Sequence, residues 1–261
     1  MSLIGEERKE IILHLLNYAG KVRTNELVEK LQVSSETIRR YLEELEHRQK
    51  LKRVYGGAIK INYDREEPSH FKREVLHAEE KKRIARTAAS LVQNNDVIVL
   101  DDGTTTLHMI GYLENKKNLT VITNSVPALS LFVDYCNKGS LSGDIFFLGG
   151  RIQSKHSRTS GLLSEKMFEH FHVDKSFISI DGIVLQQGIT SYDSDKALLA
   201  RKFIEQSNET IVMSDHSKIG MSNFYKIADI KEVDIIVSDT AIPSDWEAEL
   251  EMADIKWIVA S

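Results

Sequence analysis

The sequence predicts a two-domain protein in which a small helical domain precedes a larger α/β domain with a parallel sheet. The 261 residues leave room for two domains of about 100–200 residues each. Apolar residues recur at helical spacing in the first part of the chain, whereas short β-rich runs alternate with helical stretches beyond residue 76. We expect a first domain at residues 1–61, a linker at 62–76 and a second domain at 77–261.

The composition excludes several classes of protein. The hydrophobic content of 41% with 28% charged residues is that of a folded globule. Cys136 is the single cysteine and can form neither an intramolecular disulfide nor a Cys-based zinc site. No apolar run approaches the roughly 18 residues of a membrane span, and no signal-peptide pattern precedes Glu6. We expect a cytoplasmic protein without a membrane partner.

The charges are divided unequally along the chain. Residues 1–57 carry 11 Lys/Arg and 9 Asp/Glu, a net of +2, and the other 23 and 30 give residues 58–261 a net of −7. The overall net charge of −5 taken alone argues against nucleic-acid binding. A basic module joined to an acidic one fits this division better, and a polar run at residues 62–69 is the expected join.

The first domain begins with two predicted helices and a third that carries the candidate DNA contacts. Helical spacing covers residues 4–18, with Gly20 as a stop, and the second helix starts at Thr24, a good N-cap, and ends at a tight turn at Gln32. Ser34 is predicted to cap the third helix. In that helix Ile38, Leu42 and Leu45 face the core at i, i+4 and i+7. The side chains left for solvent or DNA are Ser35, Glu36, Thr37, Arg39, Arg40 and Tyr41.

A basic hairpin follows the third helix. Residues 51–54 and 58–61 alternate in character around Gly56 and Gly57, as in the wing of a winged helix-turn-helix. Arginines near a helix start suit phosphate and guanine contacts in a major groove. The alternative is a protein-interaction module whose arginines form a solvated face. The candidate DNA-binding residues are Ser34, Ser35, Thr37, Arg39, Arg40, Tyr41, Lys52, Arg53, Gly56 and Gly57.

Seven apolar runs predict the strands of a parallel sheet buried on both faces in the second domain. A ligand is then expected at the carboxyl ends of the strands. Polar residues follow these strands in the positions that such a site needs. The predicted strands are residues 97–100, 119–123, 145–148, 176–180, 210–214, 233–238 and 255–259.

The loop of residues 102–106, between a strand and a helix, is the most informative of these segments. Glycine lets the backbone approach an anion, and the threonines offer hydroxyl and amide groups, so the loop is a candidate phosphate cradle. The acidic pair Asp101 and Asp102 would repel a bare phosphate. Asp101 or Asp102 is therefore assigned to a sugar hydroxyl or to fixing the loop. The alternative is an Asp-Gly turn with threonines that cap a helix.

Cations after other strands favour the anion site. Lys218 could complete anion binding, and Arg151 could do the same unless it is solvated. The candidate effector-binding residues are Asp101, Asp102, Gly103, Thr104, Thr105, Thr106, Thr123, Asn124, Ser125, Gly150, Arg151, Asp181, Gly182 and Lys218.

The motifs resemble a known family. Residues 33–46 (VSSETIRRYLEELE) and 51–58 (LKRVYGGA) resemble the N-terminal signature of the DeoR family of bacterial transcriptional regulators. The strand-end segments named above, together with Gly161 and residues 174–175, resemble the sensor domain of that family. Three positions depart from the family pattern, namely Tyr41, Gln49 and Ala200.

The sensor domain of this family is similar in fold to ribose-5-phosphate isomerase. The resemblance places Val184 and Arg201 where the isomerase carries catalytic acids, and neither side chain can act as the carboxylate base of enediol chemistry. Binding without catalysis is therefore expected. A sugar-phosphate isomerase with an appended DNA-binding segment remains the alternative.

We expect a transcriptional regulator rather than an enzyme, and the resemblance implies a repressor of a sugar-metabolism operon. Its expected partners are an operator in double-stranded DNA and a phosphorylated sugar effector, and paired half-sites imply a homodimer or homotetramer. A sensor pocket that has lost its ligand and responds to a protein partner is a second alternative. We expect no cofactor and no metal, since the histidines near His170 lack metal-ligand spacing.

Overall fold

The computed structural model describes residues 3–19, 21–48, 50–54, 56–59 and 67–261. The chain forms two compact units, Met1–Arg65 and Glu66–Ser261. Each unit has hydrophobic clusters of its own. Predictions for Gly20, Gln49 and residues 60–66 lie outside the described residues.

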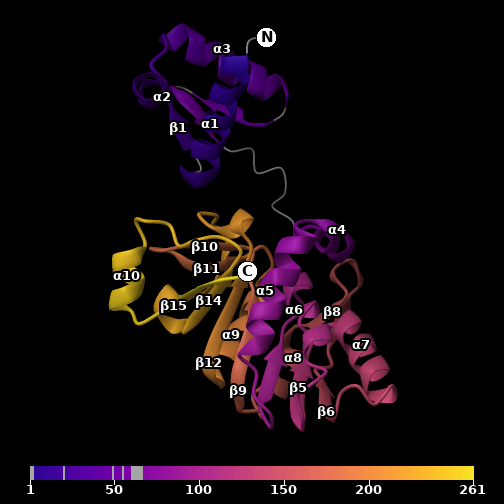
Figure 1. Cartoon of the computed structure of the whole chain (residues 1–261). Helices are drawn as coiled ribbons and strands as arrows, with labels where there is room; N and C mark the ends of the chain where they lie inside the picture. Colours follow the sequence, from indigo (N-terminus) through magenta and orange to yellow (C-terminus); the bar gives the residue numbers. More distant parts are fainter. Residues whose placement is uncertain (1–2, 20, 49, 55, 60–66) are drawn as a thin grey trace. The chain divides into compact units, whose positions relative to one another are not determined.

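The first unit combines three helices with a three-stranded antiparallel sheet (Figure 1). The predicted hairpin is confirmed, because β2 and β3 pair with Lys52 opposite Ile59 and Gly56 (φ 81°) lies between them. The strand β1 was not predicted, and it pairs with the other edge of β3. Thr24 begins the second helix but does not cap it, because Arg23 holds the cap position. The elements are α1 (Leu3–Ala19), β1 (Lys21–Arg23), α2 (Thr24–Leu31), α3 (Ser35–His47), β2 (Lys52–Val54) and β3 (Gly57–Ile59).

The second unit is built on a seven-stranded parallel sheet in the order β15-β14-β12-β9-β4-β5-β6. All seven predicted runs form strands of this sheet, which confirms the predicted α/β architecture. The chain moves outward from β4 to β5 and β6 and then returns to β9 on the other side of β4. The sheet strands are β4 (Val97–Leu100), β5 (Leu119–Thr123), β6 (Gly143–Phe147), β9 (Val173–Ser179), β12 (Ser207–Ser214), β14 (Ile235–Ser238) and β15 (Lys256–Val259).

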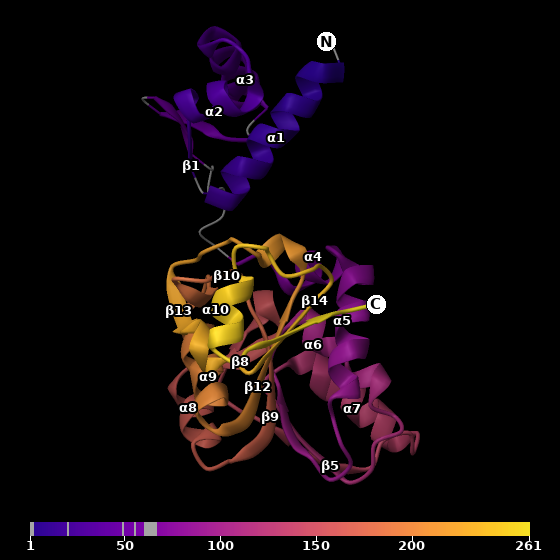
Figure 2. The same ribbon diagram turned by 60° about the vertical axis from the view of Figure 1, so that its left-hand side comes forward.

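Helices cover both faces of this sheet (Figure 2). One hydrophobic cluster joins α5 and α7 to one face, and a second cluster joins α8, α9 and α10 to the other. The helices are α4 (His70–Val75), α5 (Ala78–Ser90), α6 (Thr104–Leu107), α7 (Val126–Asn137), α8 (Leu162–Phe168), α9 (Ser194–Glu205) and α10 (Glu247–Met252), with the 3-10 turns η1 (Ile110–Tyr112), η2 (Ser154–His156), η3 (His216–Lys218) and η4 (Ile230–Glu232).

Five further strands were not predicted. β7 (Arg151–Gln153) pairs with β8 (Arg158–Ser160), while β10 (Gly182–Val184), β11 (Gly188–Ser191) and β13 (Tyr225–Ala228) form a small antiparallel sheet. These strands follow or flank the carboxyl ends of the main sheet. They extend the second unit beyond the simple alternation of strand and helix that the sequence predicts.

The predicted linker of residues 62–76 is longer than the structure allows. Residues 67–76 belong to the second unit, and α4 packs against α6 and η2. The reason is burial, because Glu67 is 3% exposed and Arg73 is 8% exposed. The charged and Pro-containing run of residues 67–76 therefore forms part of the second unit. α4 lies at the same end of the sheet as β10 and β11 (Figures 1 and 2).

Candidate functional site

The third helix of the first unit starts as the sequence predicts. The Ser34 hydroxyl caps α3 by accepting a hydrogen bond from the Thr37 backbone N–H at 3.2 Å, which satisfies one free donor of the first turn. The Thr37 hydroxyl lies 3.0 Å from that of Ser34. The side chains of Arg39 and Arg40 are exposed. The cap therefore fixes the helix end from which both arginines project.

Tyr41 contradicts the prediction that its side chain is free for DNA. The residue is 6% exposed and belongs to the hydrophobic cluster of the first unit, with the Arg40 guanidinium 5.8 Å from the ring centroid. The physical reason is spacing, because position 41 falls at i+3 from Ile38 and completes the buried stripe with Leu42 and Leu45. Tyr41 is a core residue of α3.

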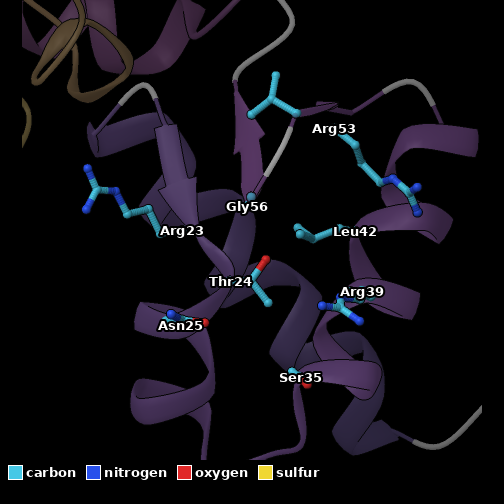
Figure 3. A pocket seen from close by; sticks show the side chains of 10 residues that line it. Arg23, Thr24, Asn25, Ser35, Arg39, Leu42, Arg53 and Gly56 are labelled. Carbon is cyan, nitrogen blue, oxygen red and sulfur yellow. The ribbon is translucent and has the colours of Figure 1, made fainter.

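A concave surface of about 700 Å³ opens between α3, the start of α2 and the hairpin (Figure 3). Arg39 extends toward this hollow from α3, while Arg23 and Arg53 lie on opposite sides of it in the figure. Three cations around one concave surface produce the positive potential that a phosphate backbone requires. The residues that line it are Arg23, Thr24, Asn25, Ser35, Arg39, Leu42, Arg53, Val54, Gly56 and Gly57.

The predicted DNA-binding residues are only partly gathered in this hollow. Ser35, Arg39, Arg53, Gly56 and Gly57 line it. Arg53 also pairs with α3, because its backbone N–H donates to the Glu46 carboxylate at 2.7 Å. The Lys52 side chain lies outside the described part of the chain. Arg23 and Asn25 were not predicted, and they reach the same surface from β1 and α2.

The second unit contains a cavity at the carboxyl ends of β4, β9 and β12. This place is the switch point of the sheet, where the order of the strands reverses and where open α/β sheets bind ligands. Four predicted residues come together there, namely Thr104, Thr105, Asp181 and Lys218. The remaining residues that line the cavity are Pro68, Arg73, Leu76, His77, Lys81, Ser179, Ile180, Met213, Asp215 and Ser217.

The cavity is small in this conformation. Its volume of about 90 Å³ is well below the roughly 300 Å³ at which small-molecule pockets begin. Pro68, Arg73, Leu76 and His77 form one of its walls, and all four belong to the first segment of the second unit. The cavity in this conformation is therefore smaller than the pockets that hold ligands of the size of a sugar phosphate.

Asp101 fixes the loop after β4. Its carboxylate accepts hydrogen bonds from the Gly103 N–H at 2.9 Å, from the Thr106 hydroxyl at 2.8 Å, and from the backbone and hydroxyl of Ser179 at 2.7 and 2.8 Å. Burial and the neighbouring Asp102 carboxylate raise the pKa of Asp101 to about 6. Of the two roles left open for this pair, Asp101 has the structural one, and Thr106 shares it.

Gly103 is required for packing. A Cβ at this position would lie 2.1 Å from the Ser179 hydroxyl and 2.3 Å from its Cβ. The loop therefore approaches β9 more closely than any other residue type allows. This glycine was predicted to let the backbone approach an anion, whereas in the structure the close contact is with Ser179 on β9.

Several other predicted effector residues do not line the cavity. Arg151 pairs instead with Asp195 at 2.6 Å, and Ser125 caps α7 through the Ala128 N–H. The Asn124 amide donates to the Thr159 carbonyl at 3.0 Å. These side chains organise neighbouring loops. The predicted residues outside the cavity lining are Asp101, Asp102, Gly103, Thr106, Thr123, Asn124, Ser125, Gly150, Arg151 and Gly182.

Lys81, which the sequence analysis did not single out, brings a further cation to the cavity. It is 5% exposed on α5, and its ammonium donates to the Arg73 carbonyl. Burial lowers the pKa of Lys81 to about 8, and the charges of Lys218 and Arg73 act in the same direction, opposed by Asp215. An anion bound in the cavity would favour the protonated form of Lys81.

Beside the cavity lies a buried ionic cluster that sequence reasoning missed. Arg158, which is 0% exposed, lies 2.9 Å from Asp102 and 2.8 Å from Glu67. Burial alone would raise the pKa of Asp102, but the charges of Arg158, Lys196 and Arg73 outweigh it and lower that pKa. Lys196 pairs with Asp181 at 3.0 Å, which connects the cluster to the cavity.

The described residues show no group of three or more His, Cys, Asp or Glu side chains placed to hold a metal ion. His172 lies 3.0 Å from the Asn208 side chain. Cys136 is half-buried against the cluster around α5 and α7. Among the residues that the structure describes, no helix has the length and apolar character that crossing a membrane requires.

Both units match known families. Residues 8–63 match the DeoR-like helix-turn-helix domain, and residues 76–240 match the DeoR C terminal sensor domain. The structure of ribose 5-phosphate isomerase A from Methanocaldococcus jannaschii is similar to part of the chain, with a TM-score of 0.40 and 19% identity over 55% of each chain.

Full-length relatives are transcriptional regulators. The Bacillus subtilis (strain 168) protein named uncharacterized HTH-type transcriptional regulator YulB is 36% identical and covers 97% of this chain and 96% of its own. The HTH-type transcriptional repressor GlcR of the same strain is 34% identical over 90% of this chain and 88% of its own. The lactose phosphotransferase system repressor of Staphylococcus epidermidis is 31% identical over 89% and 91%. The chain therefore belongs to the DeoR family of helix-turn-helix transcriptional regulators.

Proposed function

We propose that this protein represses a sugar-metabolism operon and that a phosphorylated sugar, bound in the cavity of the second unit, releases it from its operator. The observation that carries the proposal is that a DeoR-type reader and a DeoR-type sensor span one chain whose relatives are named repressors. The chain is a DNA-binding regulator and not an enzyme. We place it in the cytoplasm, where it meets DNA.

The helix-turn-helix domain of the first unit, called the reader below, would bind DNA through its concave surface. Arg39 and the exposed start of α3 suit the major groove, and Gly56 places the hairpin where its backbone can approach the phosphates. One such unit makes few contacts, so we include a homodimer or homotetramer on paired half-sites in the proposal. Light scattering of the purified chain tests this part, and a monomer at micromolar concentration would contradict it.

The sensor would hold the phosphate between the threonines after β4 and the cations opposite them. Thr104, Thr105, Lys81 and Lys218 line the cavity together, and charge-assisted hydrogen bonds from lysines are the stronger class of phosphate contact. Asp181 then faces the sugar hydroxyls. Effector binding changes operator occupancy only if the effector has different affinities for the DNA-competent and DNA-incompetent arrangements.

The test begins with genomic fragments selected by the purified protein. A gel-shift titration then asks which phosphorylated sugars release the selected fragment, and a thermal-shift screen against the same compounds reports binding to the native state. At least one phosphosugar is expected to raise the melting temperature and to release the DNA. Binding of fragments without release by any phosphosugar would leave the reader and remove the effector.

Lys218→Ala gives the proposal a residue-level test. We expect this substitution to weaken phosphosugar binding about 10- to 100-fold, since a hydrogen bond to a charged group contributes about 1.5–3 kcal/mol. Arg151→Ala removes the same charge from a side chain that is 70% exposed and outside the cavity lining, so it should leave the affinity unchanged. Unchanged release in both Lys218→Ala and Thr105→Ala would favour a sensor that answers to a protein partner.

A further inference from the structure

Glu67 is a carboxylate held by three buried cations. It lies 3.0 Å from Arg73, 2.8 Å from Arg158 and 3.7 Å from Lys196, and the Glu67 side chain is 1% exposed. His156 approaches it at 3.5 Å. Such an arrangement, in which several fixed cations converge on one anionic group, is what proteins use to recognise carboxylates and phosphates.

The hydrogen-bonding capacity of this cluster is not used by Glu67. Neither carboxylate oxygen of Glu67 has a hydrogen-bond partner of good geometry among the described residues, and the same holds for Nε and Nη2 of Arg73 and Nη2 of Arg158. Asp101, by contrast, accepts hydrogen bonds from Gly103, Thr106 and Ser179. Nη2 of Arg73 and Nη2 of Arg158 lie 3.7 Å from Asp102 and 3.3 Å from Asp193 as ion pairs, so these donors have opposite charges nearby but no well-aligned acceptor. Poorly satisfied buried donors are costly, and an acceptor that aligns with them would fit the cluster better than Glu67 does.

Glu67 is also the carboxylate of this cluster that can most easily leave. Asp102 and Asp181 each lie two residues after a strand of the main sheet, whereas Glu67 precedes α4 in a segment without regular structure. It lies two residues after Arg65, the last residue of the first unit. The same segment closes the cavity through Pro68 and Arg73.

The cluster and the cavity form one continuous site. Arg73 lines the cavity and pairs with Glu67, and Asp181 lines the cavity and pairs with Lys196. A ligand whose phosphate lies at Thr105 and Lys218 can therefore direct its other end toward the cations that hold Glu67. That end would need a negative charge to replace the carboxylate.

We propose that Glu67 occupies the place of a second anionic group of the effector. A sugar derivative with two separate anionic groups, called doubly anionic below, would displace Glu67 from Arg73, Arg158 and Lys196. The inference rests on the proposed function and narrows its ligand class to sugar bisphosphates and phosphorylated sugar acids. Displacement of Glu67 exchanges its ion pairs with the three cations for those of the ligand, which gives the effector a different affinity for the Glu67-bound and Glu67-displaced states of the second unit.

The test compares two pairs of probes that differ by one anionic group. Glucose 6-phosphate is paired with 6-phosphogluconate, and fructose 6-phosphate with fructose 1,6-bisphosphate. Calorimetric titrations use the full chain, Glu67→Gln, and Glu74→Gln as the matched control, because Glu74 lies on α4 with a side chain that is 47% exposed. Glu67→Gln should bind the doubly anionic member of at least one pair about tenfold more tightly, since the competing state is removed.

The affinity for the member of the pair with one anionic group should change less than about twofold in Glu67→Gln, because that ligand does not reach the three cations. Glu74→Gln should bind every probe as the unchanged chain does. Without ligand, Glu67→Gln should melt at a lower temperature, and the doubly anionic probe should restore more of that loss than its partner does. If Glu67→Gln does not fold, Glu67→Asp serves instead, with the same direction of change and a smaller size.

Equal gains or equal losses for both members of each pair would show Glu67 to be a structural ion pair, and would overturn the inference while leaving the phosphosugar proposal in place. If none of the four probes binds any of the three proteins, the inference fails for these ligand classes, and the thermal-shift screen decides the phosphosugar proposal separately.

Discussion

We expect Lys81 to make the affinity of the second unit for an anion dependent on pH. Burial lowers its pKa to about 8, so the side chain is mostly protonated at pH 7 and mostly neutral above pH 8.5. Only the protonated form attracts a phosphate, whose own second pKa of about 6 leaves its charge constant in this range. We expect the affinity for a phosphosugar to fall by up to about tenfold per unit as the pH rises above 8.

Calorimetric titrations between pH 7 and 9.5 measure this dependence. Lys81→Met, which keeps the length of the side chain, should bind more weakly at pH 7 and should lose the decline above pH 8. A decline of the same size in Lys81→Met would assign the pH dependence to another group.

At the residue scale, charge is easy to find in a sequence and burial is not. Thr104, Thr105 and Lys218 were predicted because they follow apolar strands whose carboxyl ends meet. Arg158 and Glu67 lie in polar runs, where charged side chains are normally exposed. Their burial depends on partners distant in the chain, such as Asp102, and no local pattern reports such partners.

We expect the start of α3 to determine how the first unit binds DNA. Arg39→Ala should weaken operator binding about 5- to 150-fold, since a good arginine contact to a base contributes about 1–3 kcal/mol. If Arg39 contacts a phosphate instead, binding weakens on all sequences and the salt slope falls by about 1. Lys138→Ala removes the same charge at the exposed C-cap of α7 in the second unit and should leave gel-shift titrations unchanged.

The loop that joins β4 to α6 depends on its close approach to β9. Gly103→Ala should lower the free energy of unfolding by about 1–3 kcal/mol, because the added Cβ overlaps Ser179 and disturbs the hydrogen bonds of Asp101. Gly149→Ala is the matched control, since a Cβ at that position meets nothing within 4 Å. Urea denaturation measures both, and equal stability of the two variants would contradict this account of the loop.

At the element scale, periodicity was the reliable signal. The seven main strands were predicted because runs buried on both faces are nearly continuous in apolar residues, as in residues 97–100. β1 and β8 have three residues each and contain arginine, so no such run exists. Tyr41 was placed on the wrong face because the stripe was counted at i, i+4 and i+7 without the i+3 position.

On the scale of the whole molecule, two units with separate hydrophobic clusters should unfold separately. The cluster around Ile38 contains residues of the first unit alone, and those around Phe132 and Phe203 contain residues of the second. In differential scanning calorimetry, we expect two transitions. An effector at about 100 times its Kd should stabilise the second unit by about 2.7 kcal/mol and leave the other transition in place. A single transition that moves as a whole would show the two units to be coupled in stability.

The order of strands in the two sheets has a consequence for synthesis. The sheet of the first unit is complete once β3 (Gly57–Ile59) has been made, whereas the central pair of the main sheet joins β4 to β9, which are separated by more than 70 residues. Long-range pairs of this kind form slowly, and domains fold as units from the N-terminus during translation. A nascent chain on the ribosome can therefore fold its first unit before the strands of the main sheet have all been made.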